Sequence, residues 1–213
     1  MGKEGHTPNT IAQKGISGEE LAWQTLVKSD PEKIQRRAKV TYDQASQVYT
    51  LTSFGCDLGI SLKDNRIFGF LPEGEALLDK LDSSTGLTLL WYLISAKDIP
   101  ISGKWVRPDS LPGGQIYVKG SHVLPVDQIA EKYGSDAQAF IDIGKQFGGD
   151  VLDYGDAAIR FLPFPRVPVA LTLWTADEEF PARANLLVDA NCELQIPTDI
   201  IWATCMLSLE LML

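Results

Sequence analysis

The sequence predicts an α+β fold in which antiparallel strands are packed by helices. Two groups of strand-forming segments carry this prediction: a three-stranded meander over residues 47–70 and a C-terminal strand group over residues 157–190. Segments with the apolar spacing of helices precede, separate and follow these groups. The pattern leaves open whether the two strand groups form one sheet or two.

At 213 residues the chain has the length of one domain and is long enough to bury a core. Residues 1–15 are predicted to be a flexible tail, and residues 16–213 a single α+β domain. Ser17 and Glu20 form a capping box, which begins a helix expected to end near Lys28.

A second helix and the meander follow. Asp30 and Pro31 suit the cap and the first position of a helix that should end near Lys39. Within residues 47–70 the strand-forming segments are separated by residues typical of turns. Residues 83–85 then offer caps for an almost wholly apolar helix, which should lie in the core.

Three further helices are predicted in the second half of the chain. Two of them span residues 125–133 and 135–147, with Ser135 as the cap of the second. The last begins with Thr198 as its predicted N-cap, and residues 200–213 carry a single charge. A helix that is apolar nearly all round is buried in its own core or against a partner, so homo-oligomerisation stays open.

The most informative stretch is an acid-rich hairpin in the C-terminal strand group. Residues 167–174 and 184–188 are runs of strand-forming residues, and the hydrophobicity falls sharply between them. Asp177, Glu178 and Glu179 occupy that polar segment, so we expect them at the tip of a long hairpin.

Three adjacent carboxylates can hold a hard cation, accept hydrogen bonds from a ligand or supply an acid of raised pKa. The alternative is a solvated loop tip with no further role. Trp174 precedes the acidic residues and Phe180 follows them, and such large apolar groups would hold the tip rigidly. The two interpretations are evenly balanced.

Basic and aromatic residues elsewhere suggest a binding surface. Trp105 and Arg107 are two apart on an extended segment and would share a face, from which they could stack on and hydrogen-bond a planar anionic ligand. The alternative is a surface arginine lying over a core tryptophan. The predicted ligand-binding residues are Trp105, Arg107, Arg166, Trp174, Asp177, Glu178 and Glu179.

The charge balance narrows the classes of partner. A net charge of −9 argues against binding to nucleic acid, whose phosphates would repel this surface, and against anionic membranes. No apolar run reaches the length needed to span a bilayer, and the first ten residues lack the apolar core of a secretory signal. We therefore expect a cytoplasmic protein.

Cysteine and histidine offer no obvious catalytic or metal site. The three cysteines, Cys56, Cys192 and Cys205, are far apart in the sequence and are expected to be free thiols. His122 is the one histidine outside the tail, and we expect it to be structural. No pair of nucleophile and base is visible, so catalysis stays undecided and no cofactor is assigned from the residues.

Four motifs together resemble a known family. They are Gly103-x-Trp105, Gly148-Gly149, Pro165-Arg166-Val167-Pro168 and Leu173-Trp174-x-x-Asp177-Glu178-Glu179-Phe180-Pro181-Ala182. They resemble an uncharacterised family, catalogued as a domain of unknown function, of anaerobic bacteria and archaea; the match covers about residues 15–213. Some relatives are fused to an iron–sulphur domain of the corrinoid-protein type. The resemblance implies a role near corrinoid chemistry, with any cluster supplied by a corrinoid or iron–sulphur protein partner.

Three hypotheses follow. The first is a binding or accessory module for a corrinoid or another large planar cofactor in anaerobic metabolism. The second is a protein–protein adaptor that uses the apolar C-terminal helix. The third is a carboxylate-based, metal-dependent enzyme in which Asp177, Glu179 and either Asp156 or Asp189 hold Mg²⁺ or Ca²⁺.

Overall fold

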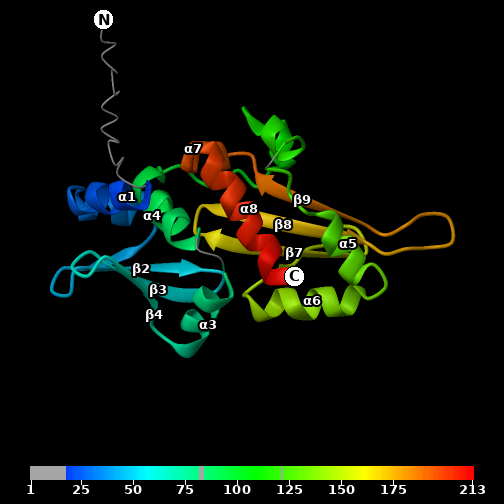
Figure 1. Ribbon diagram of the computed structural model, residues 1–213, viewed down its shortest axis with the longest axis horizontal. Helices are drawn as coiled ribbons and strands as arrows, with labels where there is room; N and C mark the ends of the chain where they lie inside the picture. The colour runs from blue at the N-terminus through cyan, green and yellow to red at the C-terminus, as the bar shows by residue number, and fades with distance from the viewer. Residues whose placement is uncertain (1–17, 82–83, 121) are drawn as a thin grey trace, which may run out of the picture.

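The computed structural model describes residues 18–81, 84–120 and 122–213. The predicted tail over residues 1–15 and the capping residue Ser17 lie outside the described residues. The α+β fold is confirmed: helices are combined with antiparallel strands in two sheets (Figure 1). The two predicted strand groups are therefore separate.

The N-terminal sheet has four described strands in sequence order. They are β1 (Thr41–Asp43), β2 (Val48–Ser53), β3 (Cys56–Ser61) and β4 (Arg66–Gly69), all antiparallel. The predicted meander over residues 47–70 is confirmed as β2, β3 and β4, and β1, which precedes that range, adds a fourth strand to the sheet. At three residues β1 is too short to show an alternating pattern, and it is held by pairing with β2, where the rings of Tyr42 and Tyr49 lie 4.5 Å apart.

The C-terminal sheet has five described strands in the order β5, β9, β8, β7, β6. Their bounds are β5 (Trp105–Val106), β6 (Asp150–Val151), β7 (Ala157–Phe164), β8 (Val167–Trp174) and β9 (Arg183–Asp189). The predicted strand group is confirmed, and the two-residue edge strands β5 and β6 extend it. A hydrogen bond of 2.9 Å from the N–H of Phe54 to the carbonyl oxygen of Leu162 joins the two sheets.

The described helices complete the fold. They are α1 (Gly18–Val27), α2 (Pro31–Ala38), α3 (Pro72–Lys80), α4 (Thr85–Ser95), α5 (Asp127–Tyr133), α6 (Ala137–Gln146), α7 (Cys192–Gln195) and α8 (Thr198–Met212), with 3₁₀ turns η1 (Pro108–Ser110) and η2 (Gly114–Tyr117). The side chain of Asp30 caps α2 as predicted, accepting from the N–H of Glu32 at 3.0 Å. Helix α3 was not predicted.

Two predicted caps are wrong by one residue. Asp136, not Ser135, caps α6, because its carboxylate accepts from the N–H of Ala139 at 2.9 Å. Pro197 stands at the cap of α8, and Thr198 is the first helical residue. Each shift leaves the helix itself where the sequence placed it.

One face of the C-terminal sheet is covered by helices α5, α6 and α8 (Figure 1). On this face the side chains of Ile159, Leu171 and Leu186 belong to a core that also includes residues of the N-terminal sheet. Helix α8 is buried along its length within the chain, against α4, α6 and β7. Among the described helices, none has both the length and the apolar character needed to cross a bilayer.

Candidate functional site

The predicted acidic hairpin is present. Strands β8 and β9 pair antiparallel from Val169 opposite Val188 to Trp174 opposite Arg183, and residues 175–182 form the connecting loop. The loop lies at the end of the hairpin farthest from α7 (Figure 1).

The conformation of the loop is held by one carboxylate. Oδ1 of Asp177 accepts hydrogen bonds from the N–H of Glu179 at 2.8 Å and the N–H of Phe180 at 2.7 Å. The N–H of Asp177 in turn donates to the carbonyl oxygen of Phe180 at 3.0 Å. This is a side-chain-stabilised turn of the kind that Asp favours. Glu178 and Glu179 are exposed.

A cavity of about 280 Å³ opens beside this turn. It is lined by Asp156, Trp174, Thr175, Asp177, Phe180, Pro181 and Arg183, which we call the tip cavity. The guanidinium carbon of Arg183 lies 4.8 Å from the centre of the Trp174 ring, a cation–π arrangement. Phe180 is 65% exposed beside them, which is unusual for an aromatic side chain with no covering element.

Asp156 connects the tip cavity to the loop before β7. Its Oδ2 accepts from both the N–H and the hydroxyl of Thr175, each at 2.8 Å. These two hydrogen bonds, with a smaller contribution from the charge of Arg183, lower the pKa of Asp156. The group is therefore ionised at neutral pH and acts only as an acceptor.

Glycine allows this loop to approach Trp174 closely. Gly155 has a φ of 58°, and a Cβ there would lie 2.7 Å from the carbonyl oxygen of Leu173 and 3.2 Å from the Trp174 ring. A larger residue would push the loop away from the cavity. Arg183, Phe180 and Gly155 are not among the residues predicted for the site. Arg183 could be found only by aligning the two predicted strands of the hairpin, which places it opposite Trp174.

Arg166 lies far from the tip cavity. It sits in the turn between β7 and β8, at the opposite end of β8 from Trp174, so the two are separated by roughly 25 Å. The side chain is 5% exposed and donates to the carbonyl oxygens of Arg37 at 2.6 Å, Ile99 at 2.9 Å and Arg36 at 3.2 Å, and to Asp98. These bonds tie α2 and the segment after α4 to the sheet.

Trp105 and Arg107 are not brought to the tip cavity either. Trp105 lies opposite Asp189, six residues along β9 from Arg183, which is roughly 20 Å. Arg107 follows the end of β5 and makes a two-pronged contact with Asp109, at 3.0 Å and 2.9 Å. Of the seven predicted residues, Trp174 and Asp177 line the same cavity.

The described part of the chain contains no group of three or more His, Cys, Asp or Glu side chains that could hold a metal ion. Asp189 is 1% exposed and accepts from the N–H and hydroxyl of Ser102 and the N–H groups of Gly103 and Asn191. This carboxylate therefore anchors the loop before β5.

Histidine and the cysteines stand apart from the tip cavity. His122 is exposed and meets the ring of Trp202 edge-on, with 5.0 Å between ring centres. The cysteines are free thiols as predicted. Burial raises the pKa of Cys192 to about 12 and that of Cys205 well above its ordinary value, so neither is a ready nucleophile.

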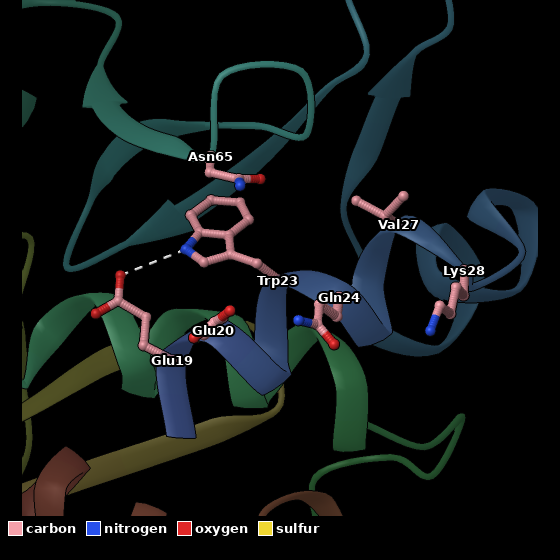
Figure 2. A pocket seen from close by; sticks show the side chains of 7 residues that line it. All are labelled: Glu19, Glu20, Trp23, Gln24, Val27, Lys28 and Asn65. Carbon is pink, nitrogen blue, oxygen red and sulfur yellow. Dashed lines mark hydrogen bonds between the residues drawn. The ribbon is translucent and has the colours of Figure 1, made fainter. Parts of the chain in front are cut away.

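A larger cavity of about 470 Å³ lies along α1 (Figure 2). Figure 2 shows the Trp23 ring beneath Asn65, with its Nε1–H directed to Oε1 of Glu19 at 3.4 Å. None of the predicted ligand-binding residues lines this cavity.

Comparison with known proteins yields one match. The model of a domain of unknown function (DUF3786) matches residues 30–210. No curated protein and no solved structure matches the chain.

Proposed function

The chain belongs to the family of a domain of unknown function (DUF3786), and on that premise we propose that it is a binding or accessory protein for a planar, amide-rich cofactor of the corrinoid class. The observation that carries the proposal is the tip cavity, where an aromatic ring, a cation and two carboxylates converge. Such a combination of a flat apolar surface with a few placed polar groups is typical of small-molecule sites.

The flat surface is supplied by Trp174 and Arg183. The guanidinium carbon of Arg183 lies 4.8 Å from the centre of the half-buried Trp174 ring, and the exposed ring of Phe180 lines the same cavity. Stacking of aromatic groups and cations on a planar ligand is favourable by about 0.5–2 kcal/mol per contact. This combination of aromatic rings and a cation therefore suits the edge of a macrocycle.

The carboxylates supply the polar specificity. Asp156 and Asp177 carry acceptor oxygens already oriented by hydrogen bonds to the hairpin backbone. An ionised carboxylate accepts from N–H donors and forms the stronger, charge-assisted kind of hydrogen bond. The amide groups around a corrin ring are donors of this kind.

The size of the cavity favours an accessory role. A volume of about 280 Å³ is too small to enclose a whole corrinoid and would hold one edge of it. The remainder would be held by a corrinoid or iron–sulphur protein partner. The protein would then contact a cofactor that is bound mainly elsewhere.

The alternatives have weaker support. Helix α8, on which the adaptor hypothesis rests, is buried within the chain. For the metal-dependent enzyme, the described residues bring no three carboxylates together in a group that could hold an ion, and Asp189 is engaged by the loop before β5. Cofactor binding at the tip cavity is thus the function that the geometry supports best.

The test is a titration of the purified protein with dicyanocobinamide and aquacobalamin, followed by absorbance and by thermal unfolding. We expect a spectral change and a raised Tm for the wild type. Trp174→Ala should weaken binding about tenfold, equivalent to about 1.4 kcal/mol. Trp105→Ala is the matched control and should bind as the wild type does. Absence of any change with either ligand would refute the proposal.

A further inference from the structure

Strand β9 has one edge that is only partly paired. Along one side it bonds to β8 from Arg183 to Val188, whereas on the other side β5 pairs only with Val188 and Asp189. The stretch from Arg183 to Leu187 therefore has no strand beside it on the β5 side within the described chain. Open strand edges are sites at which another chain can add a strand.

The register shows which backbone groups are unpaired. The N–H of Ala190 donates to the carbonyl oxygen of Lys104 at 2.9 Å, and Val188 lies opposite Val106. In an antiparallel sheet the direction of the backbone groups alternates from residue to residue. The N–H and C=O groups of Leu186 and Ala184 therefore point, like those of Val188, away from β8.

The sequence explains why β5 stops. Continuing its register places Pro108 opposite Leu186, at a position where a strand would have to donate an N–H. Proline has no N–H to donate, and the chain instead turns into η1 at Pro108. Among the described residues, no backbone hydrogen bond reaches the edge-facing groups of Leu186 or Ala184.

A cavity of about 340 Å³ runs along this edge. The strand contributes Ala184, Asn185 and Leu186, of which Leu186 is 4% exposed, and the opposite wall includes Tyr117, Val118, Val123, Leu124, Val126 and Asp127. On that wall Val118 and Val123 are about half exposed, although they are large apolar side chains. A groove with unpaired backbone groups along one side and apolar side chains along the other can bind an extended peptide.

The charges in this groove are unequal. Arg107 is neutralised by its two-pronged contact with Asp109. Asp127, the first residue of α5, is exposed and also lines the groove. The groove therefore carries an excess negative charge, which complements a basic side chain.

We propose that this groove binds an extended peptide segment of a partner protein, which adds to the sheet antiparallel to β9. The peptide completes the pairing that β5 begins, through hydrogen bonds to Leu186 and Ala184. An apolar side chain packs against Val118 and Val123, and a lysine or arginine lies near Asp127. The site is separate from the tip cavity and does not depend on cofactor binding there.

The first test is amide hydrogen exchange in the free protein. If the edge is open, the amides of Ala184 and Leu186 exchange at least about tenfold faster than those of Asn185 and Leu187, which bond to β8. The neighbouring amides of the same strand serve as the internal control. Equal, strong protection of all four amides would mean that the edge is already covered, and would overturn the proposal.

The second test uses a fluorescein-labelled peptide, Thr-Lys-Val-Thr-Val-Thr-Gly, and its analogue with Glu in place of Lys, measured by fluorescence anisotropy. We expect the lysine peptide to bind, and to slow exchange at Ala184 and Leu186. Ala184→Pro removes one edge N–H without touching the β8 ladder, and should weaken binding about fivefold. Val123→Asp, in the opposite wall, should weaken it at least as much.

A third test reverses the charge of Asp127 in the groove. Asp127→Lys should reverse the preference, so that the glutamate peptide binds more tightly than the lysine peptide. Val151→Asp, an exposed position on β6 at the far edge of the sheet, is the control and should bind as the wild type does. Failure of both peptides to bind, or binding that is unaffected by Ala184→Pro and Val123→Asp, would overturn the proposal.

Discussion

Arg183 lies opposite Trp174 across the β8–β9 hairpin, and its guanidinium carbon is 4.8 Å from the centre of the indole ring. This pair forms the wall of the tip cavity nearest the sheet. Because the β8–β9 ladder places the two backbones opposite each other, the two side chains are brought together before any ligand arrives. Pre-organisation of this kind lowers the cost of binding.

Replacement of Arg166 should destabilise the fold. Arg166→Ala removes donors from the carbonyl oxygens of Arg36, Arg37 and Ile99, and we expect the free energy of unfolding to fall by about 3 kcal/mol. Arg107→Ala, which removes an exposed arginine paired with Asp109, should cost less than about 1 kcal/mol. Urea denaturation measures both. Equal losses would contradict the assignment of Arg166 to structure.

The buried carboxylate of Asp189 should be equally sensitive. Asp189→Asn replaces one acceptor oxygen by an amide group that cannot accept from Ser102 or Gly103, and should destabilise the protein by about 2 kcal/mol. Asp153→Asn, at an exposed position, is the control and should change stability little. Chemical denaturation of the two variants measures the free energy of unfolding. If the two variants are equally stable, Asp189 does not anchor the loop before β5.

The pKa of Asp156 should depend on Thr175. The backbone N–H of Thr175 lowers this pKa most, and its hydroxyl lowers it further. Because the pKa is lower in the folded state, the stability that this carboxylate contributes is present above its unfolded pKa and is lost as the pH falls through the folded pKa. Thr175→Val should raise the pKa of Asp156, as followed by NMR titration of its carboxyl carbon. An unchanged titration would contradict the role of the hydroxyl.

The buried thiols should resist alkylation. Burial raises the pKa of Cys192 to about 12, and Cys205 is fully buried, so both remain protonated and shielded near pH 8. Cys56 is half-buried and should react first with iodoacetamide. Mass spectrometry of the native protein would show one label at Cys56, and three labels after unfolding. Rapid native labelling of Cys192 would show that its surroundings open readily.

Much of the fold could be predicted because its signals are local. Asp30 and Pro31 begin α2 where the sequence indicates, and the two apolar runs around the acidic loop become β8 and β9. Strands β1 and β6 are not predicted, and β5 is predicted only as an extended segment, because segments of two or three residues have no periodicity and only pairing with a neighbouring strand defines them.

The candidate site was less predictable, because it depends on register. Trp174 and Asp177 were identified from composition, but Arg183 is recognised only once β9 is aligned with β8. Arg166 has the residue type of a ligand-binding group, and only its buried hydrogen bonds identify it as a structural one. Likewise, the open edge at Leu186 follows from the position of Pro108 in the register of β5.

The most direct test of cofactor binding at the tip cavity is the indole N–H spectrum of the protein during titration with dicyanocobinamide. The chain has five tryptophans, of which Trp174 lines the tip cavity. If the cofactor binds at the tip cavity, we expect the Trp174 signal to shift with increasing ligand while those of Trp23 and Trp105 stay in place. A Trp174 signal that does not move at saturating ligand, or a shift confined to the other tryptophans, would contradict binding at this cavity.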